Sequence, residues 1–292
     1  MSRQGRFDAP EALAASLPLP AGIDLAAVVA FVQARRQAGG GFGATPRLPA
    51  TVEDTFQALA TFRALADLGA PGEHLAACRQ DQALQTFLAR MAGHRELGLR
   101  TMAQLVASSR LAAADLDLGY AQAAARRQLG QQPGLEAVHH AWQILGPEGL
   151  GEALQSLGPA WLQRLTPSRP TCRGMMLLVE VAAAAGEELP AARTGRLAAW
   201  FAACQSPDGG FGFFPGTTSF IEHSLFCLRG LSRLGAPARD PDAAVRFLAS
   251  CQTRAGGFGR RANAAPFLDA TAHGLAALAA LCGASPPPVL PV

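Results

Sequence analysis

Two acid–imidazole pairs are the first residues in this sequence with the potential for chemistry. Glu222 is followed directly by His223, and Asp269 is followed four residues later by His273. Each acid comes ten residues after the tetrapeptide Gly-Gly-Phe-Gly and opens a stretch rich in alanine and leucine. Carboxylate and imidazole groups are adequate ligands for zinc. If the two stretches begin side by side, these four residues form a candidate metal site.

The carboxylates also have a simpler interpretation as helix-capping groups. Glu53 and Asp54 follow another copy of the tetrapeptide by ten and eleven residues, so acids recur at this place in three repeats. Acids in a first helical turn stabilise the exposed N–H groups by about 0.3–1 kcal/mol. Both interpretations therefore stay open for Glu222 and Asp269.

The histidines are harder to explain as caps, because an imidazolium is unfavourable at a helix N-terminus. This favours a functional role for His223 and His273. A further pair, His139 and His140 in "EAVHHAWQILG", would face the same interior if that segment is an inner helix.

The residues that follow two of the tetrapeptides differ in kind. Phe213 and Phe214 follow one copy, whereas Arg260 and Arg261 follow the next, in "GGFGRRAN". Guanidinium groups bind phosphate oxygens in pairs, and helix N-termini favour anions. The arginines are thus candidates for an anionic group and the phenylalanines for an apolar one, although two exposed solubilising arginines would look the same.

The tetrapeptide occurs three times, with its phenylalanine at Phe42, Phe211 and Phe258. Glycine admits positive φ and close backbone approach, so each copy predicts a tight link whose phenylalanine packs between neighbouring helices. Cys204 and Cys251 precede two copies and are interpreted as small buried hydrophobic residues.

Helical segments follow from the apolar periodicity and from glycines that end the apolar stretches, which is the usual helix stop signal. These glycines are Gly69, Gly119, Gly146, Gly186, Gly235 and Gly283. The predicted pairs are 25–37 with 51–68, 80–92 with 100–117, 120–129 with 135–145, 150–165 with 171–185, 191–204 with 218–234, and 241–251 with 267–281.

One helix of each pair is nearly apolar all round, and its partner is amphipathic. An all-apolar helix belongs inside a fold and an amphipathic one on its surface. We therefore expect an all-α ring, an α6/α6 toroid of six helical hairpins, whose apolar inner helices surround a central cavity. We expect one domain over 1–292, with roughly the first 20 and the last 9 residues irregular.

Composition excludes several classes of protein. The chain has 292 residues, a net charge of +3 and no basic run, so nothing indicates a nucleic-acid partner. No apolar run is long enough for a transmembrane helix or a signal peptide, which predicts a cytoplasmic protein. All basic residues are arginine, and alanine is abundant, which is typical of a GC-rich bacterial genome.

The repeat of Cys-Gln, Gly-Gly-Phe-Gly and a small-residue helix resembles that of the terpenoid cyclase and protein prenyltransferase superfamily. The segment "EHSLFCLRGLSRLG", with His223 near the start of an inner helix, is most similar to protein prenyltransferase β subunits. The resemblance implies an α/α toroid that binds an isoprenoid diphosphate and transfers the prenyl group. The acceptor is unknown: a small molecule and another protein both stay open, and so does a second protein subunit.

The site residues that the resemblance implies are only partly present in this sequence. It gives His223 and Asp269 catalytic roles and a zinc ligand set of His223, Asp269, Glu222 and His273. The family's Asp-x-Cys is not intact, because Asp269 is followed by Ala270 and Thr271. Arg260 and Arg261 would bind the diphosphate, and Phe213 and Phe214 would guide the isoprenoid.

Two other functions stay open. A terpene cyclase would need an aspartate-rich acid motif, for which Asp115 and Asp117 in "ADLDLG" are a poor match. A noncatalytic toroid that binds a lipid or a protein partner would also carry incomplete zinc and diphosphate motifs.

Overall fold

The computed structural model describes residues 22–131, 133–158 and 160–283. Within these ranges the regular elements are helices, α1 to α13, and the loops add isolated β-bridges. The irregular ends expected at both termini lie outside the described residues.

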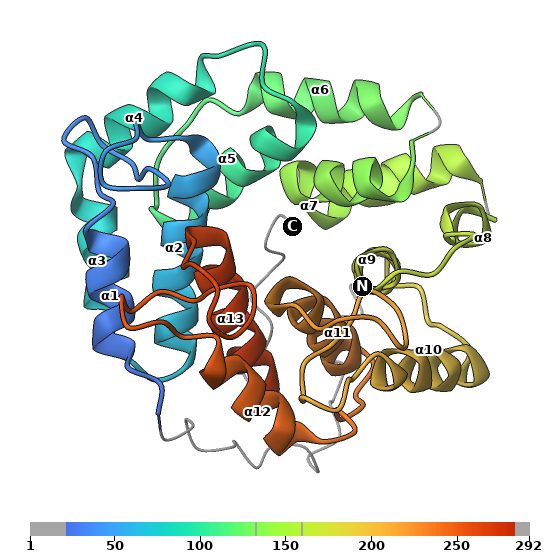
Figure 1. Ribbon diagram of the computed structural model, residues 1–292. Coiled ribbons are helices and arrows are strands. Elements are labelled where there is room, and N and C mark those ends of the chain that lie inside the picture. Colours follow the sequence, from blue (N-terminus) through green and yellow to red (C-terminus); the bar gives the residue numbers. More distant parts are fainter. Residues whose placement is uncertain (1–21, 132, 159, 284–292) are drawn as a thin grey trace.

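Six helices form an inner ring (Figure 1). They are α2 (Val52–Asp67), α5 (Leu99–Leu111), α7 (Leu135–Leu157), α9 (Cys172–Ala184), α11 (Ile221–Arg233) and α13 (Leu268–Leu281). Each packs against the next in this order, and α13 packs against α2, so the ring is closed. The predicted all-α toroid is confirmed.

The remaining helices lie outside this ring (Figure 1). They are α1 (Leu25–Gln33), α3 (Glu73–Gln80), α4 (Gln82–Ala92), α6 (Gly119–Leu129), α8 (Trp161–Leu165), α10 (Ala191–Ala203) and α12 (Pro241–Ser250). In α12 the buried residues are Ala244, Phe247 and Leu248, at the three- and four-residue spacing of one helix face. Outer helices therefore bury a single stripe, whereas inner helices are buried on most sides.

Local sequence accounts for several helix starts. Asp240 caps α12 by accepting a hydrogen bond from the Ala243 N–H, and Pro241 occupies the first helical position. Thr51 caps α2 through the Asp54 N–H, and Thr171 caps α9 through the Gly174 N–H. Such caps fix where each helix begins, and hence which side chains reach the barrel mouth.

The Gly-Gly-Phe-Gly loops join neighbouring repeats, as predicted. Phe42, Phe211 and Phe258 are buried, which confirms them as packing residues. The N–H of each donates a 3.0 Å hydrogen bond to a buried hydroxyl on the inner helix that follows. These hydroxyls belong to Thr55, Ser224 and Thr271. Cys204 and Cys251 are also buried, in agreement with their interpretation as packing residues.

The last of these loops closes the ring onto the first helix. Gly256 has φ +92°, and a Cβ atom there would lie 2.1 Å from the Ala27 carbonyl oxygen of α1. The Gln252 amide accepts a hydrogen bond from the Asp24 N–H (2.9 Å) and donates one to the Asp24 carbonyl (2.8 Å). Gln205 makes the equivalent pair of bonds with Asp240 at the start of α12. The repeated Cys-Gln thus joins each loop to the next outer helix.

Several predicted boundaries are wrong. The helix expected over 25–37 ends at Gln33, and α3 was not predicted before the helix expected over 80–92. The helix expected over 100–117 ends at Leu111, and Gly119 begins α6 instead of ending a helix. Ala113 takes the positive φ (49°) that a stop glycine would provide, so the helix ends without one.

The helix expected over 150–165 is interrupted as well. Gly158 has a positive φ, and α8 begins only at Trp161. The segment before this break begins at Pro147. Gly146, with a φ of 78° and a ψ of −177°, separates that segment from the helix over residues 135–145. Gly146 is therefore a helix break, as predicted, although the helical hydrogen-bond pattern resumes immediately.

Candidate active site

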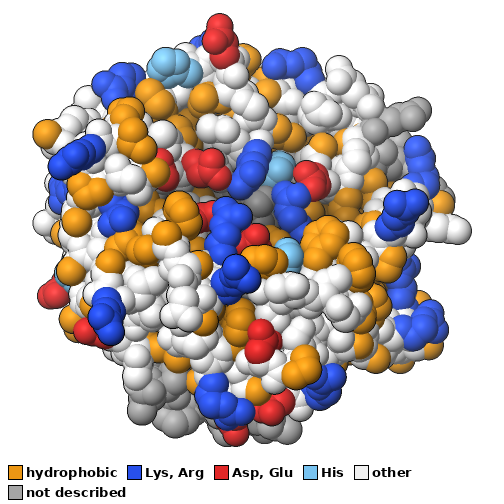
Figure 2. All heavy atoms as spheres, viewed as in Figure 1, with side chains coloured by type: hydrophobic (Ala, Val, Ile, Leu, Met, Phe, Trp, Pro, Cys, Tyr) orange, Lys and Arg blue, Asp and Glu red, His pale blue; other side chains and the backbone are white. Residues whose placement is uncertain are grey.

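The inner helices place a ring of charges at one mouth of the barrel. The second residue of each inner helix is charged, namely Glu53, Arg100, Glu136, Arg173, Glu222 and Asp269. Neighbouring helices pair these charges. Arg100 lies 3.1 Å from Glu53, and Arg173 forms an ion pair with Glu136. Figure 2 shows acidic and basic side chains, with histidines among them, gathered at the centre of this face.

Arg260 completes the charge pairing at this mouth. Its guanidinium lies 3.2 Å from Asp269 and 3.8 Å from Glu222, and its carbonyl oxygen accepts a hydrogen bond from the Ile221 N–H. Burial raises the pKa of Glu222; the Arg260 charge opposes this rise and the Asp269 charge adds to it. Arg261 is exposed, and no carboxylate of the described residues lies within ion-pair distance of it. The structure thus separates the two arginines: Arg260 is paired, and Arg261 is free.

His223 lies between two aromatic rings on the same rim. Its ring centroid is 5.4 Å from that of Phe213 and 5.5 Å from that of Phe220. Burial lowers the pKa of His223, so the imidazole is neutral near pH 7. Its Nδ1 atom has no hydrogen-bond partner in the part of the chain that the structure describes. A neutral imidazole with a free nitrogen can accept a proton.

His273 lies deeper, one and a half turns into α13. Burial lowers its pKa to about 4, with the nearby Asp269 carboxylate opposing the shift, and its Nδ1 is unpartnered. Among residues 22–131, 133–158 and 160–283, no three His, Cys, Asp or Glu side chains come together as a metal site. Asp269 and Glu222 share Arg260 instead, so the predicted zinc ligands do not fit a metal here, and we derive no step through zinc.

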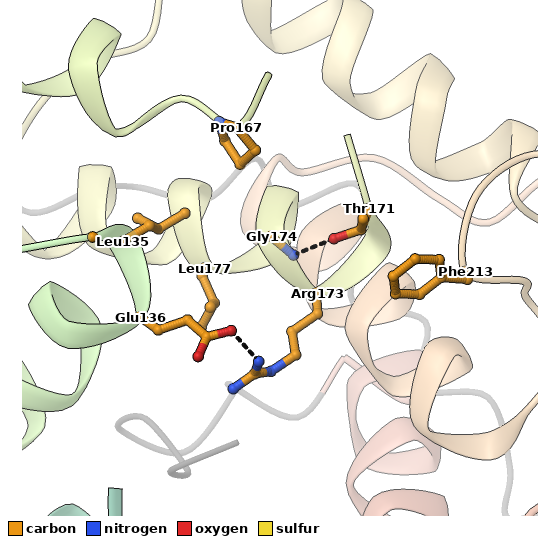
Figure 3. Close-up of a pocket in the computed structure, with 9 residues that line it drawn as sticks. Leu135, Glu136, Pro167, Thr171, Arg173, Gly174, Leu177 and Phe213 are labelled. Atoms are coloured by element: carbon orange, nitrogen blue, oxygen red, sulfur yellow. Dashed lines mark hydrogen bonds and ion pairs between the residues drawn. The ribbon is translucent and has the colours of Figure 1, made fainter. Parts of the chain in front are cut away.

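A pocket of about 350 Å³ opens at this mouth between the starts of α7 and α9 (Figure 3). Its apolar walls include Leu135, Leu177, Pro167 and Phe213. Arg173, ion-paired with Glu136, supplies the guanidinium on its wall. The Phe213 carbonyl accepts a hydrogen bond from the Cys172 N–H, which fixes this loop against the start of α9. Phe213, predicted to guide an apolar substrate, therefore lines the pocket, whereas Phe214, Arg260 and Arg261 do not belong to its lining.

The barrel interior is more polar than predicted. The Glu180 carboxylate, fully buried on α9, bonds His139 Nε2 of α7 at 3.0 Å and forms an ion pair with Arg229 of α11. Burial alone would raise the pKa of Glu180, but Arg229 and His139 outweigh it and lower the pKa to about 2. The expectation of inner helices that are apolar all round is wrong at this level. His139 is in the interior, as predicted, and His140 is buried beside it.

Sequence reasoning missed Arg173, Glu180 and Arg229. Arg173 had a signal, because charged residues recur at the second position of all six inner helices. Glu180 and Arg229 are single charges in apolar stretches, and an isolated charge there indicates a buried pair only once its partner helix is known.

Comparison with known proteins agrees with the fold. The family described as prenyltransferase alpha-alpha toroid domain matches residues 12–100, 163–221 and 218–286, most of the chain. No curated protein sequence matches. Two solved structures of variants of the type II terpene cyclase MstE from Scytonema are similar over almost their whole length. One, in complex with geranylgeranyl dihydroxybenzoate, has 13% identity and a TM-score of 0.60, with 89% of this chain and 96% of that chain covered.

The other, in complex with merosterolic acid A, has 15% identity and a TM-score of 0.61, with 88% of this chain and 96% of that chain covered. At this identity the likeness extends to the fold alone. None of the described helices combines the length and apolar character that crossing a bilayer requires. The sequence match over most of the chain, together with the closed ring of inner and outer helices, shows that the chain belongs to the prenyltransferase alpha-alpha toroid domain family.

Proposed function

We propose that this protein binds an isoprenoid diphosphate at the helix N-terminal mouth and transfers its prenyl group to an acceptor. The observation that carries the proposal is the pocket of about 350 Å³, which has apolar walls and the Arg173 guanidinium at one helix start. Ligand pockets typically measure about 300–1,000 Å³ and combine apolar walls with few polar groups. The geranylgeranyl dihydroxybenzoate bound to the cyclase MstE supports the isoprenoid part of such a substrate.

The two ends of such a substrate match two parts of the mouth. The isoprenoid chain would lie against Leu135, Leu177 and Phe213, where each buried methylene contributes about 0.8 kcal/mol. The diphosphate would bind Arg173 at the start of α9 and the free guanidinium of Arg261. Arg260 is a weaker candidate, because it pairs with two carboxylates, Asp269 and Glu222, and lies outside the pocket lining. Arg173 also pairs with a carboxylate, that of Glu136, but it lines the pocket.

The reaction needs a cationic group that binds the leaving diphosphate, aromatic rings that face the carbocation, and a base that takes the proton of the acceptor. The bond between C1 of the prenyl chain and the diphosphate oxygen breaks, and the diphosphate leaves with the electron pair. The faces of Phe213 and Phe220 can stabilise the resulting allylic cation. The acceptor then bonds to C1 and loses its proton to His223, whose neutral imidazole has a free nitrogen.

Cyclisation is the second candidate, favoured by the raised pKa of Glu222, because a larger fraction of this carboxyl carries a proton to donate than in an ordinary glutamate. Glu180 cannot play that part, because its pKa of about 2 keeps it ionised. The two reactions differ in what they release. Prenyl transfer liberates inorganic diphosphate, whereas protonation-initiated cyclisation leaves it attached to the product.

Calorimetric titration with geranylgeranyl diphosphate and with geranylgeraniol tests the binding step. We expect Arg173→Gln to weaken diphosphate binding about ten- to a hundred-fold and to leave alcohol binding nearly unchanged, because a charge-assisted hydrogen bond is lost. Arg261→Ala should also weaken diphosphate binding at least about tenfold. The matched control is Arg100→Gln, which removes the equivalent arginine of α5, paired with Glu53 but outside the pocket.

Product analysis separates the functions. Release of inorganic diphosphate supports prenyl transfer. A cyclic product that keeps its diphosphate, or binding with no reaction in the presence of thiol, phenol and peptide acceptors, contradicts it. Equal losses in Arg173→Gln and Arg100→Gln would contradict the assigned diphosphate site.

A further inference from the structure

Polar side chains occupy one face of each of three inner helices, in the interior of the barrel. Residues four apart share a helix face. The pairs are Gln104 and Ser108 on α5, His139 and Gln143 on α7, and Arg229 and Arg233 on α11. Helix α5 packs against α7, and Glu180 of α9 bridges α7 to α11. All are buried except Arg233, which is half-buried at the end of its helix.

Many polar atoms of this cluster have no hydrogen-bond partner within residues 22–131, 133–158 and 160–283. They are Gln104 Nε2, Ser108 Oγ, His139 Nδ1, both amide atoms of Gln143, Arg229 Nε and Nη1, and Arg233 Nε. Leaving a buried polar group unpaired costs about 1–3 kcal/mol, and more for a charged one. A native fold does not concentrate such costs on facing helices unless something fills the space between them. Ordered water or a polar ligand must pair with these atoms, and the charge of the cluster favours a ligand.

The charge of the cluster specifies the ligand further. Arg229 and Arg233 carry two positive charges. Glu180 is the one carboxylate of the described residues that interacts electrostatically with both. Burial lowers the pKa of His139, so its imidazole adds no charge near pH 7. Two guanidinium groups therefore share one carboxylate, and an anion at this place would balance the remaining positive charge.

We infer that the barrel interior holds an oxyanion, a carboxylate or a phosphate, bound by Arg229 and Arg233. Arg229 uses Nη2 for Glu180, and its Nε and Nη1, like Nε of Arg233, have no partner among the described residues. The Gln143 and Gln104 amides supply further donors, and His139 Nδ1 accepts a hydrogen bond from a hydroxyl of the same ligand, because Nε2 donates to Glu180. A hydroxy acid or a hydroxylated phosphate meets both requirements.

This site is separate from the mouth pocket. Arg229 and Arg233 lie eight and twelve residues after Ile221, so they are about 12 and 18 Å along α11 from the mouth. Half-buried Arg233 is the last residue of α11, at the helix C-terminal end of the barrel. The inference therefore stands whether or not the mouth binds an isoprenoid diphosphate.

Thermal unfolding with sodium benzoate, inorganic phosphate and sodium chloride at equal ionic strength tests the inference, and the two oxyanions distinguish a carboxylate from a phosphate ligand. We expect at least one oxyanion to raise the wild-type melting temperature well above the chloride value. Arg233→Gln should weaken the apparent affinity about tenfold or more. Glu180→Gln should tighten it, because the carboxylate that competes for Arg229 is gone.

Arg63→Gln is the matched control, since Arg63 lies in the last turns of α2 with its guanidinium already bonded to Asp67 at 2.8 Å. It should change oxyanion affinity by less than about twofold. Arg173→Gln, at the opposite mouth, should leave the benzoate affinity unchanged and remove only phosphate that binds at the proposed diphosphate site. Wild-type protein that responds equally to chloride and to both oxyanions would overturn the inference. So would equal losses in Arg233→Gln and Arg63→Gln.

Discussion

At the scale of single residues, burial decides the protonation state of the histidines. His273 lies inside the barrel with a pKa of about 4, because burial disfavours its charged form more strongly than Asp269 favours it. An exposed histidine in the unfolded chain titrates near 6.5. Between these values the unfolded chain binds a proton that the folded chain does not, so stability falls as pH falls.

We therefore predict that His273→Gln flattens the pH dependence of stability between about pH 6.5 and 4. The wild type should lose on the order of 2 kcal/mol more than the variant over this window, because only the wild-type imidazole must be protonated on unfolding. Urea unfolding at pH 7 and pH 5 measures the difference. Parallel pH profiles for the two proteins would contradict the assigned burial of His273.

At the scale of elements, the loops between repeats depend on glycines that no other residue can replace. Gly256 combines a φ of +92° with a contact that would place a Cβ 2.1 Å from the Ala27 carbonyl oxygen. Gly209 makes the same approach to Ala243 of the next outer helix, at 2.1 Å with φ +91°. Both the backbone conformation and the contact exclude a side chain.

Gly256→Ala should cost at least about 2 kcal/mol of folding free energy, since it adds backbone strain to a steric clash. The contrasting variant is Gly195→Ala, in the exposed middle of α10, where an added Cβ meets nothing within 4 Å. That change should stabilise the protein by about 0.5–1 kcal/mol, because alanine is the better helix former. Denaturant unfolding of both variants tests the prediction, and similar effects on stability would refute it.

The same elements show what the sequence could predict. The Gly-Gly-Phe-Gly repeats and the stop glycines are local signals, so Phe42, Phe211 and Phe258 were correctly assigned to packing. Gly119 failed as a stop because Ala113 adopts the left-handed conformation that usually indicates glycine. Pairings between distant helices, such as Glu180 with Arg229, carry no local signal and need the three-dimensional arrangement. The ring of charges at the mouth is intermediate between a local signal and a distant pairing. A charged residue recurs at the start of each inner helix, but this pattern is seen only when the whole chain is compared.

At the scale of the whole molecule, closing the ring removes the end repeats that an open helical array would have. In an open array each repeat contacts only its neighbours, and the terminal repeats fray. Here α13 packs against α2, and Gln252 bonds Asp24 across the closure. The contact between the last and the first repeat uses the same hydrogen bonds as the contact between Gln205 and Asp240 within the chain.

This equivalence predicts that Gln252→Ala and Gln205→Ala destabilise the protein equally, by about 2 kcal/mol each. Each variant removes three bonds of one amide: two to the N-terminus of an outer helix, and one to Gly256 or Gly209. Hydrogen exchange should show equal protection of α1 and α12 in the wild type. If the closure were a weak contact, Gln252→Ala would expose α1 to exchange at little global cost, whereas Gln205→Ala would lower the stability of the entire ring. Unequal unfolding free energies together with selective exchange in α1 would show that the toroid behaves as an open array whose ends touch.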